Sequence, residues 1–303
     1  MAKSHGLIAE KQTLVMDFHP QALQLTVWNS ATINKKGFIA AIHGLTTHGM
    51  KAFHYLGPYL AQKGWTTLAI DLPGFGHWND QGHMGEKQHW AMGCVAMSKF
   101  VKLCNTYVNF HEEKIILLGS SLGGAICLKY LMDHVNDNEN LIDGMVLLAP
   151  LVDFKLPLIL YLILSLVLAV NPEKRVKIAQ FDSKGKSHDC NSIIFKEDPF
   201  QLTDISLGYF FEAFKCIKSM KKWYTTPWLE DLPTCVISAG LDTLVNPVHI
   251  KQFFMKLPAV NYSQHIHYEN AYHYLLYENI RDDLFDKIEQ FLTKIPKRRI
   301  KNE

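Results

Sequence analysis

Short apolar segments alternate along this chain with longer segments of helical periodicity, and this alternation constrains the fold more than any other feature. The strand-like segments are residues 14–18, 23–28, 38–42, 66–70, 114–118, 145–148, 235–238 and 262–268. The helical segments are residues 52–63, 86–110, 122–134, 247–257 and 275–295. Nearly continuous Val, Ile and Leu runs separated by helices are typical of a parallel sheet covered on both faces. We therefore expect an α/β fold with a mostly parallel, doubly wound sheet.

The alternation stops between Leu151 and Pro227. These residues show helical periodicity and loop composition but no clear strand. We interpret residues 151–226 as an insertion at the carboxyl end of a strand, so that residues 1–150 and 227–303 form the core. Because α/β sheets bind ligands at the carboxyl ends of their strands, the insertion is expected to form a helical lid.

The insertion contains Leu156–Val170, 15 consecutive residues that carry no charge and are almost wholly aliphatic. A helix that spans a membrane needs about 20 such residues, so a span is the least consistent interpretation. The segment suits a buried helix that lines a dry pocket for an acyl chain. It also suits a helix that lies on a lipid surface, because Lys155 precedes it and Lys174 and Arg175 follow it.

The overall charge excludes one class of partner. With 31 Lys and Arg against 29 Asp and Glu, the formal net charge is +2, whereas nucleic-acid-binding proteins usually carry a strong basic excess. None of the six cysteines forms a CxxC pair, which favours free thiols in a reducing compartment. Residues 1–12 contain no apolar core of signal-peptide length. We therefore expect a cytoplasmic protein, with peripheral association to a membrane surface as a further expectation.

Gly119-Ser120-Ser121-Leu122-Gly123 follows one predicted strand and opens a predicted helix. This is the context in which a G-x-S-x-G segment presents a nucleophilic serine on a sharp, strained turn. The glycines are needed because positions two before and two after the serine come too close to other backbone for a side chain. The N–H groups at the start of the helix favour developing negative charge. The segment predicts Ser121 as a nucleophile.

A serine hydroxyl is a weak nucleophile unless a base removes its proton, and the base is usually a histidine oriented by a carboxylate. Asp242 follows the strand at residues 235–238, and His273 follows the strand at residues 262–268. Both should lie at the same sheet edge as Ser121, in the chain order Ser, Asp, His. Glu269 and Asp231 are the alternative acids.

Other histidines compete with His273 for the role of base. His265 and His267 alternate within a strand and should share one of its faces, His134 lies on a helix surface, and His249 begins a helix. Three more, His77, His83 and His89, are spread over loop and helix, and nothing in their spacing demands a metal. No metal or cofactor is expected.

Two backbone N–H groups must also point at the oxyanion of an acyl-transfer intermediate. One is expected from Leu122, directly after the nucleophile. The other is expected from Leu45, because His43-Gly44-Leu45 follows the strand at residues 38–42. Gly44 lets the backbone approach a substrate without a Cβ in the way.

Together these segments resemble the α/β-hydrolase fold, and more narrowly the monoacylglycerol lipase and lysophospholipase branch, which is also grouped with serine aminopeptidase-like hydrolases. The resemblance covers residues 13 to 295, approximately the whole chain. It implies that Ser121, Asp242 and His273 form a catalytic triad and that Leu45 and Leu122 supply the oxyanion N–H groups. It is carried by Gly119-Ser-Ser-Leu-Gly123, His43-Gly44, Asp71-Leu-Pro-Gly-Phe-Gly76, Gly240-Leu-Asp242, and Ala271-Tyr-His273 with Glu278.

Two departures from that branch concern the loops around the site. The branch usually continues H-G-x-G-E-H after the central strand, where this chain has His43-Gly-Leu-Thr-Thr-His48. It often has Arg before the Gly-x-Gly turn, where this chain has Pro73. We therefore expect the oxyanion loop to differ in shape.

The function expected is a serine carboxylic-ester hydrolase that acts on a lipid monoester, either a monoacylglycerol or a lysophospholipid, through an acyl-enzyme on Ser121. A short-chain esterase, a thioesterase or a peptidase on the same triad are the alternatives among enzymes. The alternative of another class is a non-catalytic, hydrolase-like binding protein. The partners expected are a lipid monoester or other small acyl ester and a membrane surface contacted by the lid, and no nucleic acid.

Overall fold

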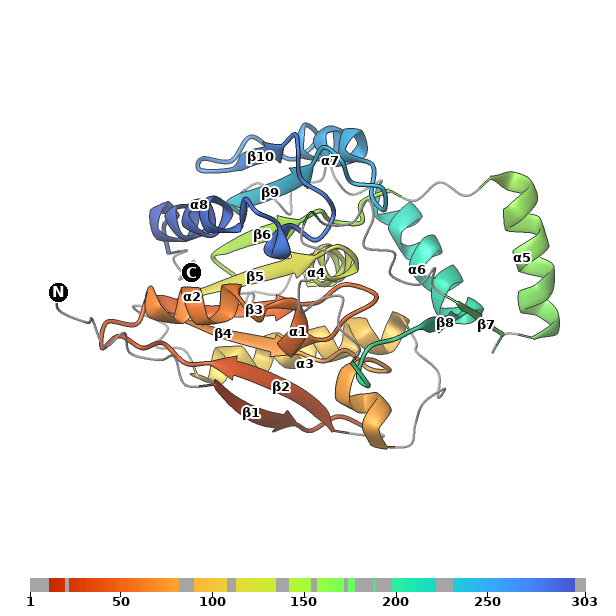
Figure 1. The fold of residues 1–303 in the computed structure, drawn as a ribbon, viewed down its shortest axis with the longest axis horizontal. Helices are drawn as coiled ribbons and strands as arrows, with labels where there is room; N and C mark the ends of the chain where they lie inside the picture. The colour runs from red at the N-terminus through yellow and green to blue at the C-terminus, as the bar shows by residue number, and fades with distance from the viewer. Residues whose placement is uncertain are drawn as a thin grey trace.

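An eight-stranded sheet forms the centre of the molecule (Figure 1). The computed structural model describes residues 11–19, 22–81, 90–107, 113–134, 142–153, 157–171, 174–177, 188, 198–221 and 231–297. β1 pairs antiparallel with β2 and β2 with β4, whereas the six strands from β4 to β10 pair in parallel. The predicted mostly parallel sheet is confirmed. In spatial order its strands are β1 (Lys11–Met16), β2 (Leu23–Trp28), β4 (Trp65–Ile70), β3 (Gly37–Ile42), β5 (Lys114–Ser120), β6 (Gly144–Leu148), β9 (Thr234–Ala239) and β10 (Gln264–Tyr268).

Helices cover both faces of this sheet and enclose two apolar cores. Within the central strand β3, Phe38, Ala40 and Ile42 join one core, and Ile39 and Ala41 join the other. Because these strands are buried on both faces, their sequences are continuous apolar runs rather than alternating apolar and polar residues. The first core is covered by α3 (Trp90–Tyr107), α4 (Leu122–Asp133) and α7 (Pro247–Phe254), and the second by α1 (Gly49–Ala52), α2 (Leu56–Gln62) and α8 (Arg281–Lys294).

Two helices that the sequence predicts as continuous are interrupted. The segment 52–63 is divided between α1 and α2, and 275–295 is divided between a 3-10 turn, η5 (Leu275–Tyr277), and α8. The two interruptions are linked, because the hydroxyl of Tyr277 donates a hydrogen bond to the backbone carbonyl of Lys51. This contact joins segments that are far apart in the chain, so local periodicity carries no sign of it. Both expected ends of the helix 86–110 lie outside the described residues.

The segment between β6 and β9 adds no strand to the large sheet in its described residues, and it lies beyond the carboxyl ends of the strands (Figure 1). It contains α5 (Leu158–Val170), β7 (Arg175–Lys177), β8 (Asp204–Ser206) and α6 (Leu207–Met220). The expectation of no strand was wrong, because β7 and β8 form a two-stranded antiparallel sheet. Three-residue strands are too short to show an alternating pattern, and an ion pair between Arg175 and Asp204 joins these two.

Helix α5 stands away from the rest of the molecule. None of its residues is buried, which differs from the predicted alternative of a buried helix. In the described part of the chain, the ring of Tyr161 in α5 packs against Phe211 and Phe214 of α6. Among the described residues, no helix is both long enough and apolar enough to cross a membrane.

Candidate active site

Ser121 occupies the sharp turn between β5 and α4. Its backbone has φ 54° and ψ −115°, a left-handed conformation that costs a residue other than glycine about 1–3 kcal/mol. The turn is held by its own backbone, because Ser121 N donates to Leu148 O at 2.8 Å and Ser121 O accepts from Gly124 N at 3.0 Å. The serine is therefore presented at the carboxyl edge of the sheet, at the N-terminus of α4.

The two glycines of the segment are required by close backbone approach. A Cβ on Gly119 would lie 2.6 Å from the carbonyl oxygen of Gly123. A Cβ on Gly123 would lie 2.2 Å from the carbonyl oxygen of Ile42 at the end of β3. Both distances are too short for any side chain, so the spacing of the segment follows from packing between α4, β5 and β3.

The loop after β3 lies directly beside the serine. A Cβ on Gly44 would be 3.3 Å from Ser121 Cβ and 3.9 Å from Ser121 Oγ. Leu45 follows this glycine, and Leu122 is the first residue of α4, where backbone N–H groups have no partner within the helix. The structure thus brings together the serine and the two segments from which the oxyanion N–H groups are expected.

Asp242 and His273 are paired and withdrawn from solvent. The His273 Nδ1–H group donates to Asp242 Oδ2 at 2.7 Å. The other oxygen of Asp242 accepts from the backbone N–H groups of Leu244 and Val245, at 2.8 and 2.9 Å. With one oxygen fixed by the turn after β9 and the other on the ring, the carboxylate sets both the tautomer and the orientation of the imidazole.

Ser121 follows β5 and His273 follows β10, so both lie at the carboxyl edge of the same sheet. In the described part of the chain, the hydrogen bonds of Ser121 are made by its backbone. Hydrogen bonds between a catalytic hydroxyl and its base are often long in an unliganded enzyme and shorten in the complex with substrate.

The alternative residues have other partners. Glu269 is exposed and contacts His267 Nε2 at 3.1 Å rather than His273. His265 and His267 share one strand face, as predicted, and both bond the hydroxyl of Ser238 at 2.8 Å. The remaining candidates also contact residues other than Ser121 or face solvent. His134 bonds the carbonyl of Tyr130, and His249 lies 3.4 Å from Asp153. Asp231 is exposed.

The buried ring of His43 joins the loop after β3 to the segment after β4 through two hydrogen bonds. Its Nδ1–H donates to Gly44 O at 2.7 Å, and its Nε2 accepts from Leu72 N at 3.1 Å. Burial lowers the pKa of His43 to about 4, so the ring is neutral near pH 7. The sequence predicts His43 only as the residue that ends a strand. Its role in joining two loops depends on a tertiary contact with the segment after β4.

Tyr274 links the histidine loop to the loop after β3. Its ring lies against His273, and its hydroxyl is 3.3 Å from the hydroxyl of Thr46. Burial raises the pKa of Tyr274 to about 12, so the phenol stays protonated. Sequence reasoning did not single out this residue, although its position directly after His273 was a usable signal.

Glu278 links the core to the segment between β6 and β9. Its carboxylate is buried and accepts from His188 N at 2.9 Å, with its second oxygen 2.5 Å from His188 Nδ1. Glu278 is one of the residues that carry the family resemblance. It directly follows η5 and lies five residues after His273 in the chain. It therefore joins the histidine loop to a residue of that segment.

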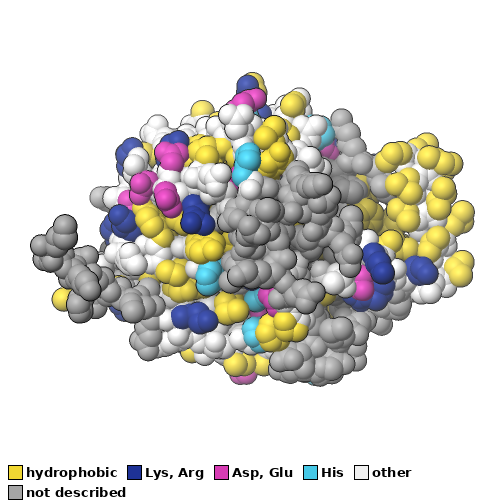
Figure 2. Space-filling view, viewed as in Figure 1, with side chains coloured by type: hydrophobic (Ala, Val, Ile, Leu, Met, Phe, Trp, Pro, Cys, Tyr) yellow, Lys and Arg dark blue, Asp and Glu magenta, His cyan; other side chains and the backbone are white. Residues whose placement is uncertain are grey.

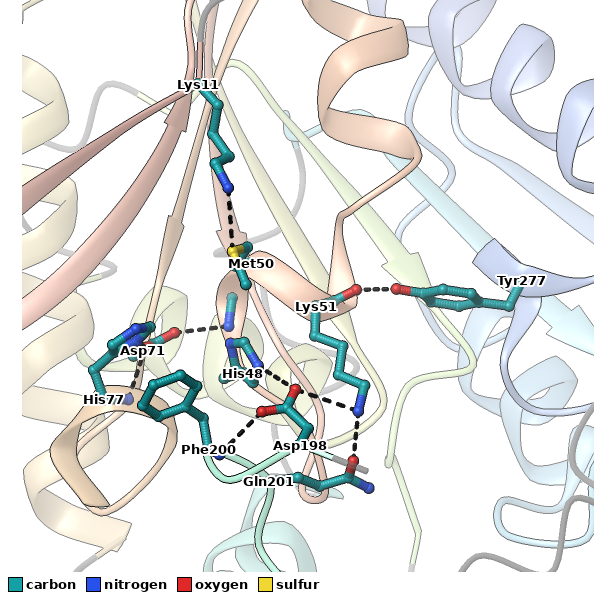
Figure 3. A network of polar contacts seen from close by, with 11 residues as sticks. Lys11, His48, Met50, Lys51, Asp71, His77, Asp198, Phe200, Gln201 and Tyr277 are labelled. Carbon is teal, nitrogen blue, oxygen red and sulfur yellow. Dashed lines mark hydrogen bonds and ion pairs between the residues drawn. The ribbon is translucent and has the colours of Figure 1, made fainter. Parts of the chain in front are cut away.

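A second polar cluster lies next to the loop after β3 (Figure 3). Asp198, from the segment between β6 and β9, is 2.9 Å from His48 Nε2 and 3.3 Å from Lys51 Nζ. Asp71, which follows β4, accepts from the N–H of Gly49 at 2.8 Å and contacts His77 Nδ1 at 2.8 Å. Sequence reasoning missed the cluster, because its members come from separate segments with no common motif.

Comparisons with known proteins agree with this fold. The family described as serine aminopeptidase, S33, matches residues 33–280. No curated protein sequence matches the chain.

Three solved structures illustrate the likeness in fold. A soluble variant of monoglyceride lipase from Saccharomyces cerevisiae, in complex with a substrate analogue, is 20% identical and covers 97% of each chain with a TM-score of 0.81. Monoacylglycerol lipase from Paleococcus ferrophilus is 19% identical, over 89% of this chain and 98% of that one, with a TM-score of 0.72. A carboxyl esterase from Bacillus coagulans, in complex with glycerol, is 13% identical, over 94% and 98%, with a TM-score of 0.67.

Proposed function

Because the chain belongs to the serine aminopeptidase, S33, family of serine hydrolases with the α/β-hydrolase fold, we propose that it hydrolyses the carboxylic ester of a lipid monoester. The substrate class is a monoacylglycerol or a lysophospholipid. One observation carries the lipid part of the proposal: an exposed, uncharged and almost wholly apolar helix, α5, lies in the insertion that follows the nucleophile in the chain. The two monoacylglycerol lipases among the structures of the same fold support it.

We propose that Ser121 Oγ attacks the acyl carbonyl while His273 Nε2 takes its proton. Asp242, 2.7 Å from Nδ1, keeps that nitrogen protonated and stabilises the imidazolium as it forms. The N–H groups of Leu45 and Leu122 receive the oxyanion. His273 then protonates the leaving alcohol, which leaves an acyl-enzyme on Ser121. Finally His273 removes a proton from water, and the water releases the fatty acid.

The strained turn supports the assignment of Ser121 as the nucleophile. A residue other than glycine at φ 54° persists only where the surrounding structure holds it. In this conformation the side chain of Ser121 lies beside the loop of Gly44. A plain strand-to-helix turn has no need of a serine in this conformation.

We propose that the segment between β6 and β9, residues 151–226, is a lid and that α5 rests on a lipid surface. Leu158, Ile159, Leu166 and Val170 are 73, 68, 70 and 87% exposed. Figure 2 shows α5 as an apolar surface at the right of the molecule, with basic side chains beside it. Exposed apolar surface of this extent marks an interaction site, and neighbouring basic residues attract anionic lipid head groups. The proposed lid could admit the acyl chain directly from the membrane.

The test compares wild type with Ser121→Ala on a panel of long- and short-chain acyl esters, a monoacylglycerol, a lysophospholipid, an acyl thioester and an aminoacyl amide. We expect the highest kcat/KM on a long-chain monoester and no activity from the variant. Preference for an acetyl ester, for the thioester or for the amide would overturn the lipid assignment in favour of the matching alternative.

A fluorophosphonate probe separates an enzyme from a non-catalytic binding protein. The probe should label wild type and fail to label Ser121→Ala. Equal labelling of the two proteins, or labelling of neither, would exclude a serine hydrolase that uses Ser121.

A further inference from the structure

His48, Asp71 and His77 place metal-ligating atoms close together at the boundary between the core and the insertion. Each offers one such atom within 4.8 Å of the other two. The three residues come from the loop after β3, the end of β4 and a 3-10 turn, η1 (Gly76–Gln81), and they meet beside Asp198 (Figure 3). Two imidazole nitrogens and a carboxylate oxygen are a donor set that suits Zn²⁺ and similar transition-metal ions.

His48 has the surroundings of a histidine ligand. Its side chain is fully buried, and its Nδ1 atom has no hydrogen-bond partner among the described residues. Its Nε2 atom lies 2.9 Å from Asp198 Oδ2. Histidine ligands commonly donate the second ring N–H to a carboxylate, which fixes the tautomer and leaves the lone pair on the first nitrogen. An ion at Nδ1 would satisfy a buried polar atom that otherwise costs about 1–3 kcal/mol.

Asp71 is held in place by the backbone. Its Oδ1 atom accepts from Gly49 N at 2.8 Å, and its Oδ2 atom faces His77 Nδ1 at 2.8 Å. The ring of His77 stacks on Phe200, with centroids 4.1 Å apart, which limits its rotation. Oδ2 also accepts from the backbone N–H of His77 at 3.1 Å, so both oxygens of the carboxylate are oriented by backbone groups while Oδ2 faces the cluster.

Gly76 keeps the space between these side chains open. A Cβ at this position would lie 2.3 Å from Asp71 Oδ2 and 2.9 Å from His48 Cβ. Its φ of +59° also favours glycine. A cavity of about 50 Å³, lined by Gln24, Asp71 and His77 among apolar residues, adjoins the cluster. That volume exceeds the roughly 10–15 Å³ that one water needs, so a water can complete the coordination.

From these observations we propose that His48, Asp71 and His77 bind one divalent transition-metal ion of the Zn²⁺ class. Asp198 does not ligate the ion but accepts the second ring N–H of His48. In a site with bonds near 2 Å, the ligating atoms need to approach one another by no more than about 1.5 Å. His77 exchanges its hydrogen bond to Asp71 for the ion, and any proton on the ligating nitrogen passes to solvent. Asp71, Asp198 and Lys51 together leave one net negative charge, which favours a cation.

The bound ion connects the insertion to the core. Asp198 belongs to the insertion, and His48 lies three residues after Leu45 in the loop beside Ser121. Occupancy therefore stabilises the loop after β3 together with the segment before β8. This inference does not depend on ester hydrolysis, because its ligands and its readouts are separate from the triad.

The first test titrates the full-length, chelator-treated protein with Co²⁺ and then with Zn²⁺. We expect one equivalent of Co²⁺ to produce the visible absorption of a site with nitrogen ligands, Zn²⁺ to displace it, and either ion to raise Tm. His77→Gln should abolish the spectrum and the rise in Tm. Asp198→Asn should weaken affinity about 10- to 100-fold, as loss of a carboxylate behind a histidine ligand does. The matched control is His267→Gln, which removes another histidine paired with a carboxylate and should bind Co²⁺ like wild type.

Each contrary outcome is decisive. Absence of saturable binding by wild type, or unchanged binding by His77→Gln, would overturn the site. Loss of binding in His267→Gln would show adventitious binding at the β10 histidines instead. A variant that does not fold is replaced by a footprint on wild type: Zn²⁺ should protect His77, 23% exposed, from diethyl pyrocarbonate and leave the reaction of His267, 37% exposed, unchanged. Equal modification of His77 with and without Zn²⁺ would reject the proposal.

Discussion

Asp242 Oδ2 lies 2.7 Å from Nδ1 of His273, and the two side chains are 0% and 5% exposed. The carboxylate makes this contact with one oxygen, while its other oxygen accepts two backbone N–H groups of the same turn. The imidazole is therefore held in one tautomer by a group that cannot rotate away. That tautomer leaves Nε2 unprotonated, which is the state a general base requires.

Asp242→Asn is expected to reduce kcat about 10⁴-fold, because an amide can donate to Nδ1 and so favour the wrong tautomer. Steady-state hydrolysis of a long-chain monoester measures the effect. Glu269→Gln is the matched control: its carboxylate contacts His267 instead, and kcat should be unchanged. A larger loss in the control than in Asp242→Asn would transfer the role of the acid to Glu269.

Gly123→Ala is expected to destabilise the protein by at least about 3 kcal/mol, because its Cβ would lie 2.2 Å from a backbone oxygen. Gly93→Ala is the comparison within α3, where the nearest atom to a new Cβ is 3.8 Å away. That variant should gain about 0.5–1 kcal/mol, since alanine favours a helix interior over glycine. Urea unfolding measures both, and equal effects would contradict the close packing of α4 on β3.

Ile159→Glu and Leu166→Glu should each weaken binding to anionic lipid vesicles about tenfold or more, because burial of such a side chain contributes about 1.5–3 kcal/mol. Both residues lie on the exposed surface of α5. Ile33→Glu, at a residue 99% exposed in the loop before β3, is the control and should bind like wild type. Co-sedimentation with vesicles measures the partition, and equal binding by all four proteins would remove α5 from the contact.

The stability of the protein should fall as pH drops from 6.5 to 4, with His43 as one cause. Burial lowers the pKa of His43 from 6.5 to about 4. In this window the unfolded chain takes up a proton that the folded protein does not, so stability decreases with falling pH, by about 3 kcal/mol in total. Above pH 6.5 neither state is protonated at His43, and the contribution is constant.

The comparison for this prediction is His43→Asn. Chemical unfolding at pH 7 and at pH 4.5 should show a smaller loss of stability in the variant than in wild type. An identical loss in both proteins would show that another group is responsible for the acid sensitivity.

The local pattern of the sequence was enough to predict the sheet and the sharp turn at Ser121. Continuous Val, Ile and Leu runs predict strands buried on both faces, and Phe38, Ile39 and Ala40 do alternate between two cores. The glycines around Ser121 predict a close turn because the steric demand acts within five consecutive residues. Both patterns depend on residues that are close together in the sequence, so they can be recognised without knowing the fold.

The tertiary structure decided which distant groups meet. Sequence left Asp242, Glu269 and Asp231 as rival acids, and only the packing of the turn after β9 against the histidine loop places Asp242 on His273. Sequence likewise left Leu156–Val170 open between a buried and a surface helix, and the folded chain leaves α5 exposed.

The cluster of His48, Asp71 and His77 is the clearest case of a site set by the fold. His48 follows β3, Asp71 follows β4 and His77 lies in η1, whereas Asp198 belongs to the segment between β6 and β9. The spacing of these residues along the chain does not indicate that they lie together in the folded protein. Sequence determined what each segment becomes, because periodicity and turn sterics act locally. The fold determined which side chains share a site, because those contacts depend on burial between segments far apart in the chain.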